Sequence, residues 1–225
     1  MFAAGVAVGY LGPGLSASVP PLRPLLGVRD RIDDAAAVGL TFDDGPHPQG
    51  TPAVLEILRD AGARATFFLA GEQVEARPSL VAEIVAAGHD VAVHCRRHRN
   101  LLRLAPWQVA EDLRRAEAAI ADASGREPRL YRPPYGVLNA AALRFARARG
   151  WTPLLWTRWG RDWERRATPA SIAAKLTGGG LRGGDVLLLH DADYYGALGS
   201  WQKTAAALPR VLDACGEAGL RVVAA

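Results

Sequence analysis

Two neighbouring carboxylates, Asp43 and Asp44, follow an apolar stretch and precede a Gly45-Pro46 turn. Adjacent ionised carboxylates are unfavourable unless a cation or a metal ion neutralises them. One oxygen ligand for a metal and one free base would be a sensible division of the pair. The alternative is an exposed Asp-Gly turn, which is common in any protein. This motif alone does not decide between the two interpretations.

Two histidines, His94 and His98, are four residues apart. On a helical turn this spacing would place both imidazoles on one face, where they can share a metal ion. Two imidazoles and one carboxylate leave open positions for water and substrate, as in catalytic zinc sites. The same ligands could hold ferrous iron for oxygen chemistry, so the ligand set alone does not define the reaction.

Further polar groups follow later apolar segments. Arg132 precedes a Pro-Pro pair that stiffens the backbone, so that the amide of Tyr135 could point at a reacting oxygen. Asp162 follows another predicted strand, and His190 ends the most apolar segment, 186–189. By itself His190 would be interpreted as a core residue. Polar motifs at five successive strand ends favour one common site.

The elements that must position these groups alternate along the sequence. Apolar segments predict strands at 38–42, 65–69, 90–93, 130–132, 152–156, 186–189 and 221–223. Helical spacing predicts helices at 51–61, 79–87, 106–123, 140–149, 168–176 and 201–215. This order predicts a single-domain α/β fold, a distorted (β/α) barrel with about seven parallel strands. The carboxyl ends of such strands share one edge, where functional groups collect.

The composition limits the class of protein. A chain of 225 residues with 22% charged residues is typical of one globular domain. The net charge of +4 comes with scattered arginines, and no nucleic-acid module surrounds the densest cluster, Arg96, Arg97 and Arg99. We therefore expect no nucleic-acid partner. An anionic cell-wall polymer stays open as a partner. Cys95 and Cys215 do not form a disulfide framework.

The N-terminal part, 1–34, is predicted to be an apolar arm or helix appended to a domain at 35–225. Its residues 2–11 are small and apolar, and this stretch is too short to span a bilayer. It lacks the basic start of a signal peptide, because the first arginine is Arg23. A remnant of an export or anchor segment and a packed helix both fit. Any membrane association would use this arm.

Together the motifs resemble the polysaccharide deacetylase family, the NodB homology domain of family 4 carbohydrate esterases. The five signature motifs occur in order: T-F-D-D-G-P from Thr41, H-x-x-x-H from His94, R-P-P-Y-G from Arg132, D-W from Asp162, and L-x-L-H ending at His190. They organise about two thirds of the chain.

The resemblance implies a metal site and a base. The metal ligands would be Asp44, His94 and His98, holding one divalent ion, zinc first, with cobalt or nickel as alternatives. Asp43 would be the general base that activates water, and Arg132 would hold that carboxylate ionised.

The resemblance also implies an acid and a substrate pocket. His190 would be the general acid for the leaving amine, oriented and charged by Asp162. The backbone amide of Tyr135 would contribute to an oxyanion site. Trp163 and Leu188 would wall the acetyl pocket.

The implied function is a metal-dependent hydrolase that removes N-acetyl groups from a polysaccharide of N-acetylglucosamine type, such as peptidoglycan, chitin or an exopolysaccharide. An O-acetyl esterase acting on xylan and a deacylase of a small amide are alternatives. A non-catalytic glycan-binding module is disfavoured by the intact set of acid, base and ligands. We expect a monomer located in the cell envelope or secreted.

Two positions depart from the family's pattern. Cys95 stands where the family prefers Ser or Thr, whose hydroxyl supports the loop after the first metal histidine. Trp159 stands three residues before Asp162, where the family often has Asp. The first departure suggests a structural substitution, with a thiol that tunes the metal or is oxidised as the alternative. The second changes the local hydrogen bonding and the substrate surface.

The loop 193–201 follows His190 and carries Tyr194, Tyr195 and Trp201. It is predicted to form part of the substrate surface, with capping of the barrel core by these rings as the alternative. His47 and His89 receive no functional role.

Overall fold

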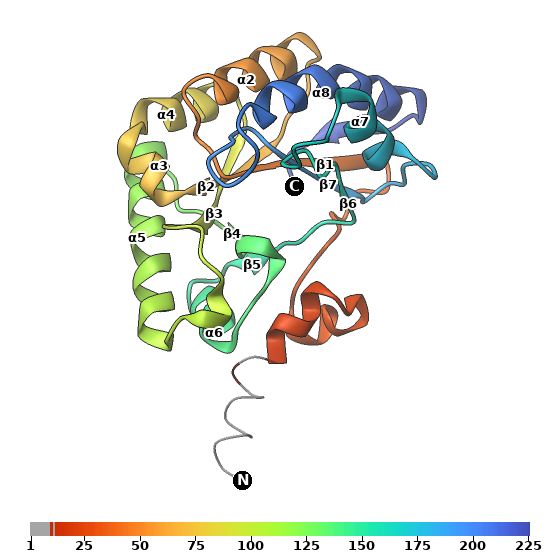
Figure 1. Cartoon of the computed structure of the whole chain (residues 1–225). Coiled ribbons are helices and arrows are strands. Elements are labelled where there is room, and N and C mark those ends of the chain that lie inside the picture. Colours follow the sequence, from red (N-terminus) through yellow and green to blue (C-terminus); the bar gives the residue numbers. More distant parts are fainter. Residues whose placement is uncertain (1–9, 11) are drawn as a thin grey trace.

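One parallel sheet forms the centre of the protein, and helices follow its strands along the chain (Figure 1). The structure, a computed structural model, describes residue 10 and residues 12–225. The strands are β1 (Ala37–Asp43), β2 (Thr66–Ala70), β3 (Asp90–Cys95), β4 (Leu130–Tyr131), β5 (Thr152–Pro153), β6 (Arg158–Trp159), β7 (Val186–His190) and β8 (Arg221–Val223). They lie in the order β5-β4-β3-β2-β1-β7-β6, with β8 beside the start of β1. The predicted distorted (β/α) barrel of about seven parallel strands is confirmed.

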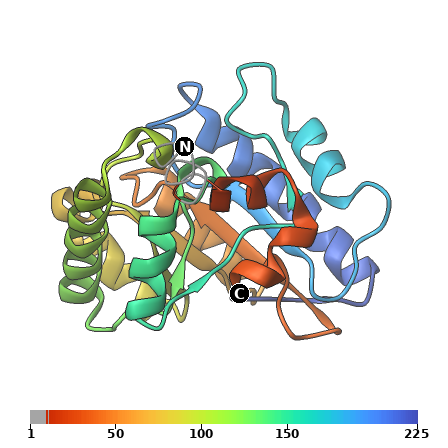
Figure 2. The same ribbon diagram turned by 90° about the horizontal axis from the view of Figure 1, so that it is seen from below.

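The helices form an outer layer around the strands, as the view from below shows (Figure 2). They are α2 (Gly50–Asp60), α3 (Gly71–Ala76), α4 (Pro78–Ala86), α5 (Pro106–Ser124), α6 (Ala140–Ala148), α7 (Pro169–Thr177) and α8 (Ser200–Glu217). α2 and α7 both contact α8, whereas α3, α4 and α6 contact α5. Short 3₁₀ turns are η1 (Gly12–Ala17), η2 (Pro20–Leu22), η3 (Pro24–Leu26), η4 (Leu101–Arg103) and η5 (Pro134–Gly136).

Local sequence signals explain where the elements begin and end. Every residue of β1 is buried, as expected for an apolar strand covered on both sides. Helix α5 begins at Pro106, which needs no hydrogen-bonded amide there, and ends at Gly125, whose φ of 67° suits glycine. The side chain of Thr168 accepts a hydrogen bond from the backbone of Ser171 and caps α7.

The predicted strand 152–156 was wrong beyond Pro153. The backbone carbonyls of Leu154 and Leu155 accept hydrogen bonds from the Arg132 guanidinium at 2.9 and 3.0 Å. These oxygens are therefore used by a side chain instead of a strand ladder. Pairing resumes at β6, which lies beside β7.

The segment before β1 contacts residues next to the edge strand β5 and residues next to β7. Arg29 forms a parallel bridge with Leu154, next to β5. Arg31 forms an antiparallel bridge with Asp185, next to β7. The segment thereby reduces the gap that the open barrel leaves at this end.

The 3₁₀ turns η1 to η3 lie on the side of the sheet away from α2, α7 and α8 (Figure 1). η1 contacts α6, and the Tyr10 hydroxyl donates to the carbonyl of Leu104 at 2.7 Å. Residues 1–9 and 11 of the predicted apolar arm lie outside the described residues. Among the helices that the structure describes, none combines the length and the apolar character needed to cross a bilayer.

Candidate active site

A pocket of about 240 Å³ opens at the carboxyl ends of β1, β3 and β7. Residues from every predicted motif contribute to it or lie directly behind it. The predicted residues that line it are Asp43, Asp44, His94, His98, Tyr135, Trp163, Leu188 and His190. Arg132 and Asp162 are fully buried and hydrogen-bond to residues of this lining. The structure therefore brings all the predicted site residues together.

The backbone is strained around this pocket. Three non-glycine residues of the described chain have positive φ: Asp44 at 80°, Tyr135 at 60° and Arg161 at 52°. The first two line the pocket, and the third directly precedes the buried Asp162. Such conformations are unfavourable for L-residues and concentrate at functional sites.

Asp44, His94 and His98 form a cluster whose ligand atoms all lie within 4.8 Å of one another. Asp44 Oδ1 is 3.3 Å from His94 Nε2 and 3.7 Å from His98 Nε2. This oxygen is buried and has no hydrogen-bond partner among the described residues. Leaving a buried carboxylate oxygen without a partner is costly, and a cation between these three groups would remove that cost.

The ionisation of the cluster suits a cation. Burial raises the pKa of Asp44, but the interaction with His94 and the positive charge of the surrounding histidines outweigh it and lower the pKa to about 2. His94 Nδ1 lies 2.8 Å from the carbonyl oxygen of Arg132. A carbonyl can only accept, so Nδ1 carries a proton, and loss of the second proton, from Nε2, would leave a lone pair that faces the cluster.

The two histidines do not share a helical turn, contrary to prediction. His94 lies within β3, and His98 follows a bend at Arg96 and Arg97. The Asp112 carboxylate holds this bend, because it accepts hydrogen bonds from the amides of Arg96 at 2.7 Å and Arg97 at 3.3 Å. The bend turns the chain back so that the imidazole centroids are 5.2 Å apart.

His98 is oriented by aromatic rings. Tyr195 stacks on its imidazole at 4.6 Å between centroids, and Tyr135 meets it edge-on at 4.5 Å. His98 Nδ1 is buried without a hydrogen-bond partner in the described part of the chain. Burial, followed by the charge of His94, lowers the pKa of His98 to about 4, so the imidazole is neutral and able to act as a ligand at neutral pH.

Asp43 and Arg132 form a buried ion pair. Arg132 Nη1 donates to Asp43 Oδ1 at 2.7 Å and to the Thr41 hydroxyl at 2.8 Å. The guanidinium also lies over the Phe68 ring, 4.0 Å from its centroid. Burial alone lowers the pKa of Arg132, and the adjacent Asp43 charge opposes that effect. The guanidinium charge balances the charge of the Asp43 carboxylate and fixes its orientation.

His190 and Asp162 form a second buried pair. His190 Nδ1 is 2.9 Å from Asp162 Oδ1, and the backbone amide of His190 donates to Asp162 Oδ2 at 2.7 Å. The Thr204 hydroxyl donates to the same oxygen at 2.7 Å. Burial lowers the pKa of His190, but the charge and hydrogen bond of Asp162 outweigh it and raise the pKa to about 10. His190 is therefore protonated at neutral pH.

Indole rings form the wall opposite the metal cluster. Trp163 meets His190 edge-on with centroids 5.2 Å apart, and Trp159 lies 5.8 Å from both Trp163 and Trp156. A β-carbon at Gly136 would lie 2.8 Å from the Trp156 ring, so the missing side chain permits this close approach. The sequence motifs do not include Trp156, which lies at the end of the predicted strand 152–156.

The loop 193–201 contributes one ring to the pocket. Tyr195 lines it, and the Tyr195 hydroxyl donates to Glu72 at 2.6 Å. Tyr194 and Trp201 instead pack beside His47, at 5.1 and 5.7 Å between ring centroids. Of the three aromatic residues of this loop, Tyr195 alone lines the pocket, whereas Tyr194 and Trp201 lie outside its lining.

His47, His89 and Cys95, the cysteine that replaces the family's Ser or Thr, have structural contacts. His47 Nδ1 accepts the backbone amide of Gly50 at 2.9 Å, at the start of α2. His89 Nδ1 accepts the amide of Ala65 at 3.3 Å. Cys95 is fully buried in β3, and burial raises its thiol pKa. These contacts explain the residues without a role in the pocket.

Comparison with known proteins gives one result throughout. The family model described as "Polysaccharide deacetylase" matches residues 30–154. A chitooligosaccharide deacetylase of Bradyrhizobium is 37% identical over 75% of this chain and 78% of that protein. A peptidoglycan-N-acetylglucosamine deacetylase of Bacillus cereus is 32% identical over 83% of this chain and 84% of that protein.

Comparison with solved structures also finds carbohydrate esterases. The structure of a family 4 carbohydrate esterase from Streptomyces lividans in complex with acetate superposes with a TM-score of 0.75. The two chains are 35% identical, and the match covers 84% of this chain and 92% of the esterase.

Proposed function

Because the chain belongs to the polysaccharide deacetylase family and is a carbohydrate deacetylase, we propose that it is a metal-dependent hydrolase of N-acetyl groups on glycans built from N-acetylglucosamine. One observation carries this proposal. A buried carboxylate-histidine cluster, an arginine-paired carboxylate and a carboxylate-paired histidine surround a single pocket.

Asp44, His94 and His98 would hold one divalent ion. Zinc suits one carboxylate and two imidazoles with open positions, and cobalt and nickel are alternatives. The fit is supported by the partnerless Asp44 oxygen and by the contact of His94 Nδ1 with the Arg132 carbonyl, which leaves Nε2 as the nitrogen that would face the ion. When bound, such an ion supplies Lewis acidity, which acidifies water and polarises a carbonyl group.

Asp43 would accept the proton of the attacking water. Its Oδ1 is held by Arg132, and the carboxylate lines the pocket beside Asp44. The guanidinium of Arg132 compensates the charge of this buried carboxylate. The same ion pair fixes the carboxylate in place, which reduces the reorganisation needed when the proton moves.

His190 would donate a proton to the leaving amine. Its Nδ1 is taken by Asp162, so Nε2 is the nitrogen available on the pocket side, 3.9 Å from Asp44 Oδ2. An amine leaves poorly as an anion, and an imidazolium at this position would protonate it as the C–N bond breaks. The backbone amide of Tyr135 would stabilise the developing oxyanion, and Trp163 and Leu188 would enclose the acetyl methyl.

The substrate class follows from what the relatives share. One is named for chitooligosaccharides and another for peptidoglycan N-acetylglucosamine, and both names imply an N-acetylated sugar. We infer action on such glycans in the cell envelope or outside the cell. We also propose that residues 35–225 form the catalytic domain and 1–34 an arm, and that the enzyme acts as a monomer.

The test combines metal analysis with acetate release. Purified protein would be loaded with zinc and assayed on N-acetylglucosamine oligomers, peptidoglycan, acetylated xylan and a small N-acetyl amide. We expect release from the first two only. Release from xylan alone would instead identify an O-acetyl esterase, and glycan binding without any release would identify a binding module.

Two variants test the assigned roles. His94→Ala should lose metal and activity together, whereas Asp43→Asn should keep the metal and lose nearly all turnover. Trp107→Ala is the control, because this exposed residue lies on α5 outside the pocket. Stoichiometric metal in His94→Ala, or full activity in Asp43→Asn, would contradict the assignments.

A further inference from the structure

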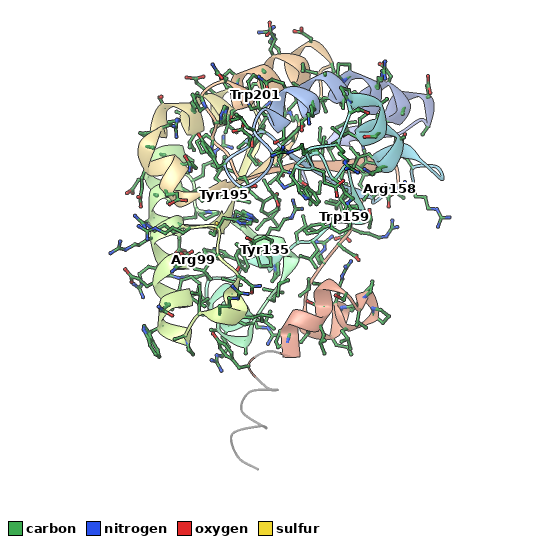
Figure 3. All side chains as sticks on the ribbon, in the orientation of Figure 1. Arg99, Tyr135, Arg158, Trp159, Tyr195 and Trp201 are labelled. Carbon is green, nitrogen blue, oxygen red and sulfur yellow. The ribbon has the colours of Figure 1, made fainter. Side chains whose placement is uncertain are left out.

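Trp159 is a large apolar side chain that remains 44% exposed although it lines the pocket. It lies on the edge strand β6, where its backbone pairs with Leu188, two residues before His190. This register places the indole at the rim of the pocket, next to the proposed acid. Figure 3 shows Trp159 and Tyr135 around the same central region, below β1 and β7.

The fold does not explain the position of this ring. Trp156 packs against both hydrophobic core clusters, whereas Trp159 belongs to neither cluster in the described part of the chain. Its aromatic neighbours are the two other indoles of the wall, Trp156 and Trp163. An exposed indole at a pocket rim that continues into two further pocket-lining indoles forms one apolar surface, and such a surface indicates a binding site.

The indoles continue outward from the reaction centre. The ring centroids of Trp163 and His190 are 5.2 Å apart, and those of Trp159 and Trp163 are 5.8 Å apart. The guanidinium of Arg161 lies 5.9 Å from the Trp159 centroid on the strained turn before Asp162. Arg161 also pairs with Glu164 at 2.6 Å, so this rim carries no unbalanced negative charge that would repel a glycan.

We propose that Trp159 forms a subsite for the sugar ring adjacent to the N-acetylated unit being hydrolysed. The inference rests on the proposed function and adds to it that the enzyme recognises an oligosaccharide instead of a single sugar. A pyranose ring presents C–H groups on its face, and an exposed indole offers a flat apolar partner for that face. When one sugar unit lies at His190, the next sugar of the chain would lie on the Trp159 ring at the pocket rim.

The experiment compares chain lengths. Trp159→Ala, Trp159→Phe and the control Trp107→Ala would be assayed on the dimer and tetramer of N-acetylglucosamine and on p-nitrophenyl acetate. For Trp159→Ala we expect KM for the tetramer to rise about tenfold, the loss typical of truncating an aromatic contact. The effect on the small ester should be several-fold smaller, and Phe should restore most of the loss. Trp107→Ala should behave as wild type.

Binding separates this inference from the proposed function. Asp43→Asn, with and without Trp159→Ala, would be titrated with the tetramer by calorimetry. About tenfold weaker binding in the double variant supports the subsite, whether or not the wild type releases acetate. Equal affinity with and without Trp159, or equal loss of activity on tetramer and ester, would overturn it. Failure of the wild type to release acetate despite such binding would contradict the proposed function alone.

Discussion

Replacing Asp162 by asparagine removes the negative charge beside His190 with almost no change in side-chain size. The pKa of His190 is about 10 because the charge and hydrogen bond of Asp162 outweigh burial. Without that charge burial dominates, and we expect the pKa to fall to about 6.5 or below. A general acid must be protonated, so the alkaline limb of the rate profile should move about three pH units towards neutrality.

The expected loss of kcat in Asp162→Asn follows from the lowered pKa of His190. At pH 8 an imidazole with a pKa of about 6.5 is protonated in roughly one molecule in thirty, so kcat on an N-acetylated glycan should fall at least about 30-fold. Complete loss of general acid catalysis would remove about 10²–10⁴-fold. An activated ester such as p-nitrophenyl acetate has a leaving group that needs no proton, so its hydrolysis should fall much less.

The variant should also be less stable. Asp162 accepts hydrogen bonds from Nδ1 and from the backbone amide of His190, and an asparagine has only one acceptor oxygen. One buried N–H therefore loses its partner, at a cost of about 1–3 kcal/mol in the free energy of unfolding. Chemical denaturation would measure this change.

The assay is kcat against pH, from about pH 6 to about pH 10, on the tetramer and on the ester. Thr204→Val is the matched control, since it removes one hydrogen bond to Asp162 but keeps the charge. Its alkaline limb should move by less than about one pH unit. An Asp162→Asn profile that coincides with wild type, or equal losses on amide and ester, would refute His190 as the acid.

Three further predictions concern the metal site and the backbone around it. The pKa of His94 is raised because the charges of the adjacent carboxylates outweigh burial, whereas the pKa of His98 is lowered to about 4. Metal binding near neutral pH should therefore release a proton from His94 and not from His98. The affinity for the metal should weaken as the pH falls. Calorimetry in buffers of different ionisation enthalpy measures this release, and the absence of any release would contradict it. Tyr195→Ala should weaken zinc binding about tenfold because His98 loses its stacked support, whereas Tyr195→Phe should not; equal affinities in a chelator competition would show that the ring is not needed. Gly50→Ala should destabilise the protein by about 1–3 kcal/mol, since its β-carbon would overlap a main-chain oxygen. Gly216→Ala, in open space within α8, should be neutral or stabilise it by up to about 1 kcal/mol, and similar thermal denaturation of the two variants would refute the packing argument.

The local patterns of the sequence determined the elements and the list of chemical groups. Strands that are buried on both faces of a sheet are continuous apolar runs, and β1 and β7 are such runs. Their positions therefore follow from the local sequence. Parallel strands have their carboxyl ends at one edge, which is why Asp43, His94 and His190 could be assigned to one site before any coordinates were considered.

The tertiary structure decided how those groups are held. A spacing of four residues fits a helix as well as a bend, and hydrogen bonds to Asp112 of α5 hold the bend between His94 and His98. Similarly, the guanidinium of Arg132 donates hydrogen bonds to the carbonyls of residues 154–155. These bonds replace strand pairing there, and Trp156 lines the pocket.

The indole wall and the stack on His98 have the same origin. Trp159 reaches the pocket because β6 pairs with β7, and Tyr195 reaches His98 while its hydroxyl donates to Glu72 in helix α3. Each of these contacts joins segments far apart in the chain. Periodicity and motif spacing report only on neighbours in sequence, so such contacts become visible only when the sheet brings the segments together.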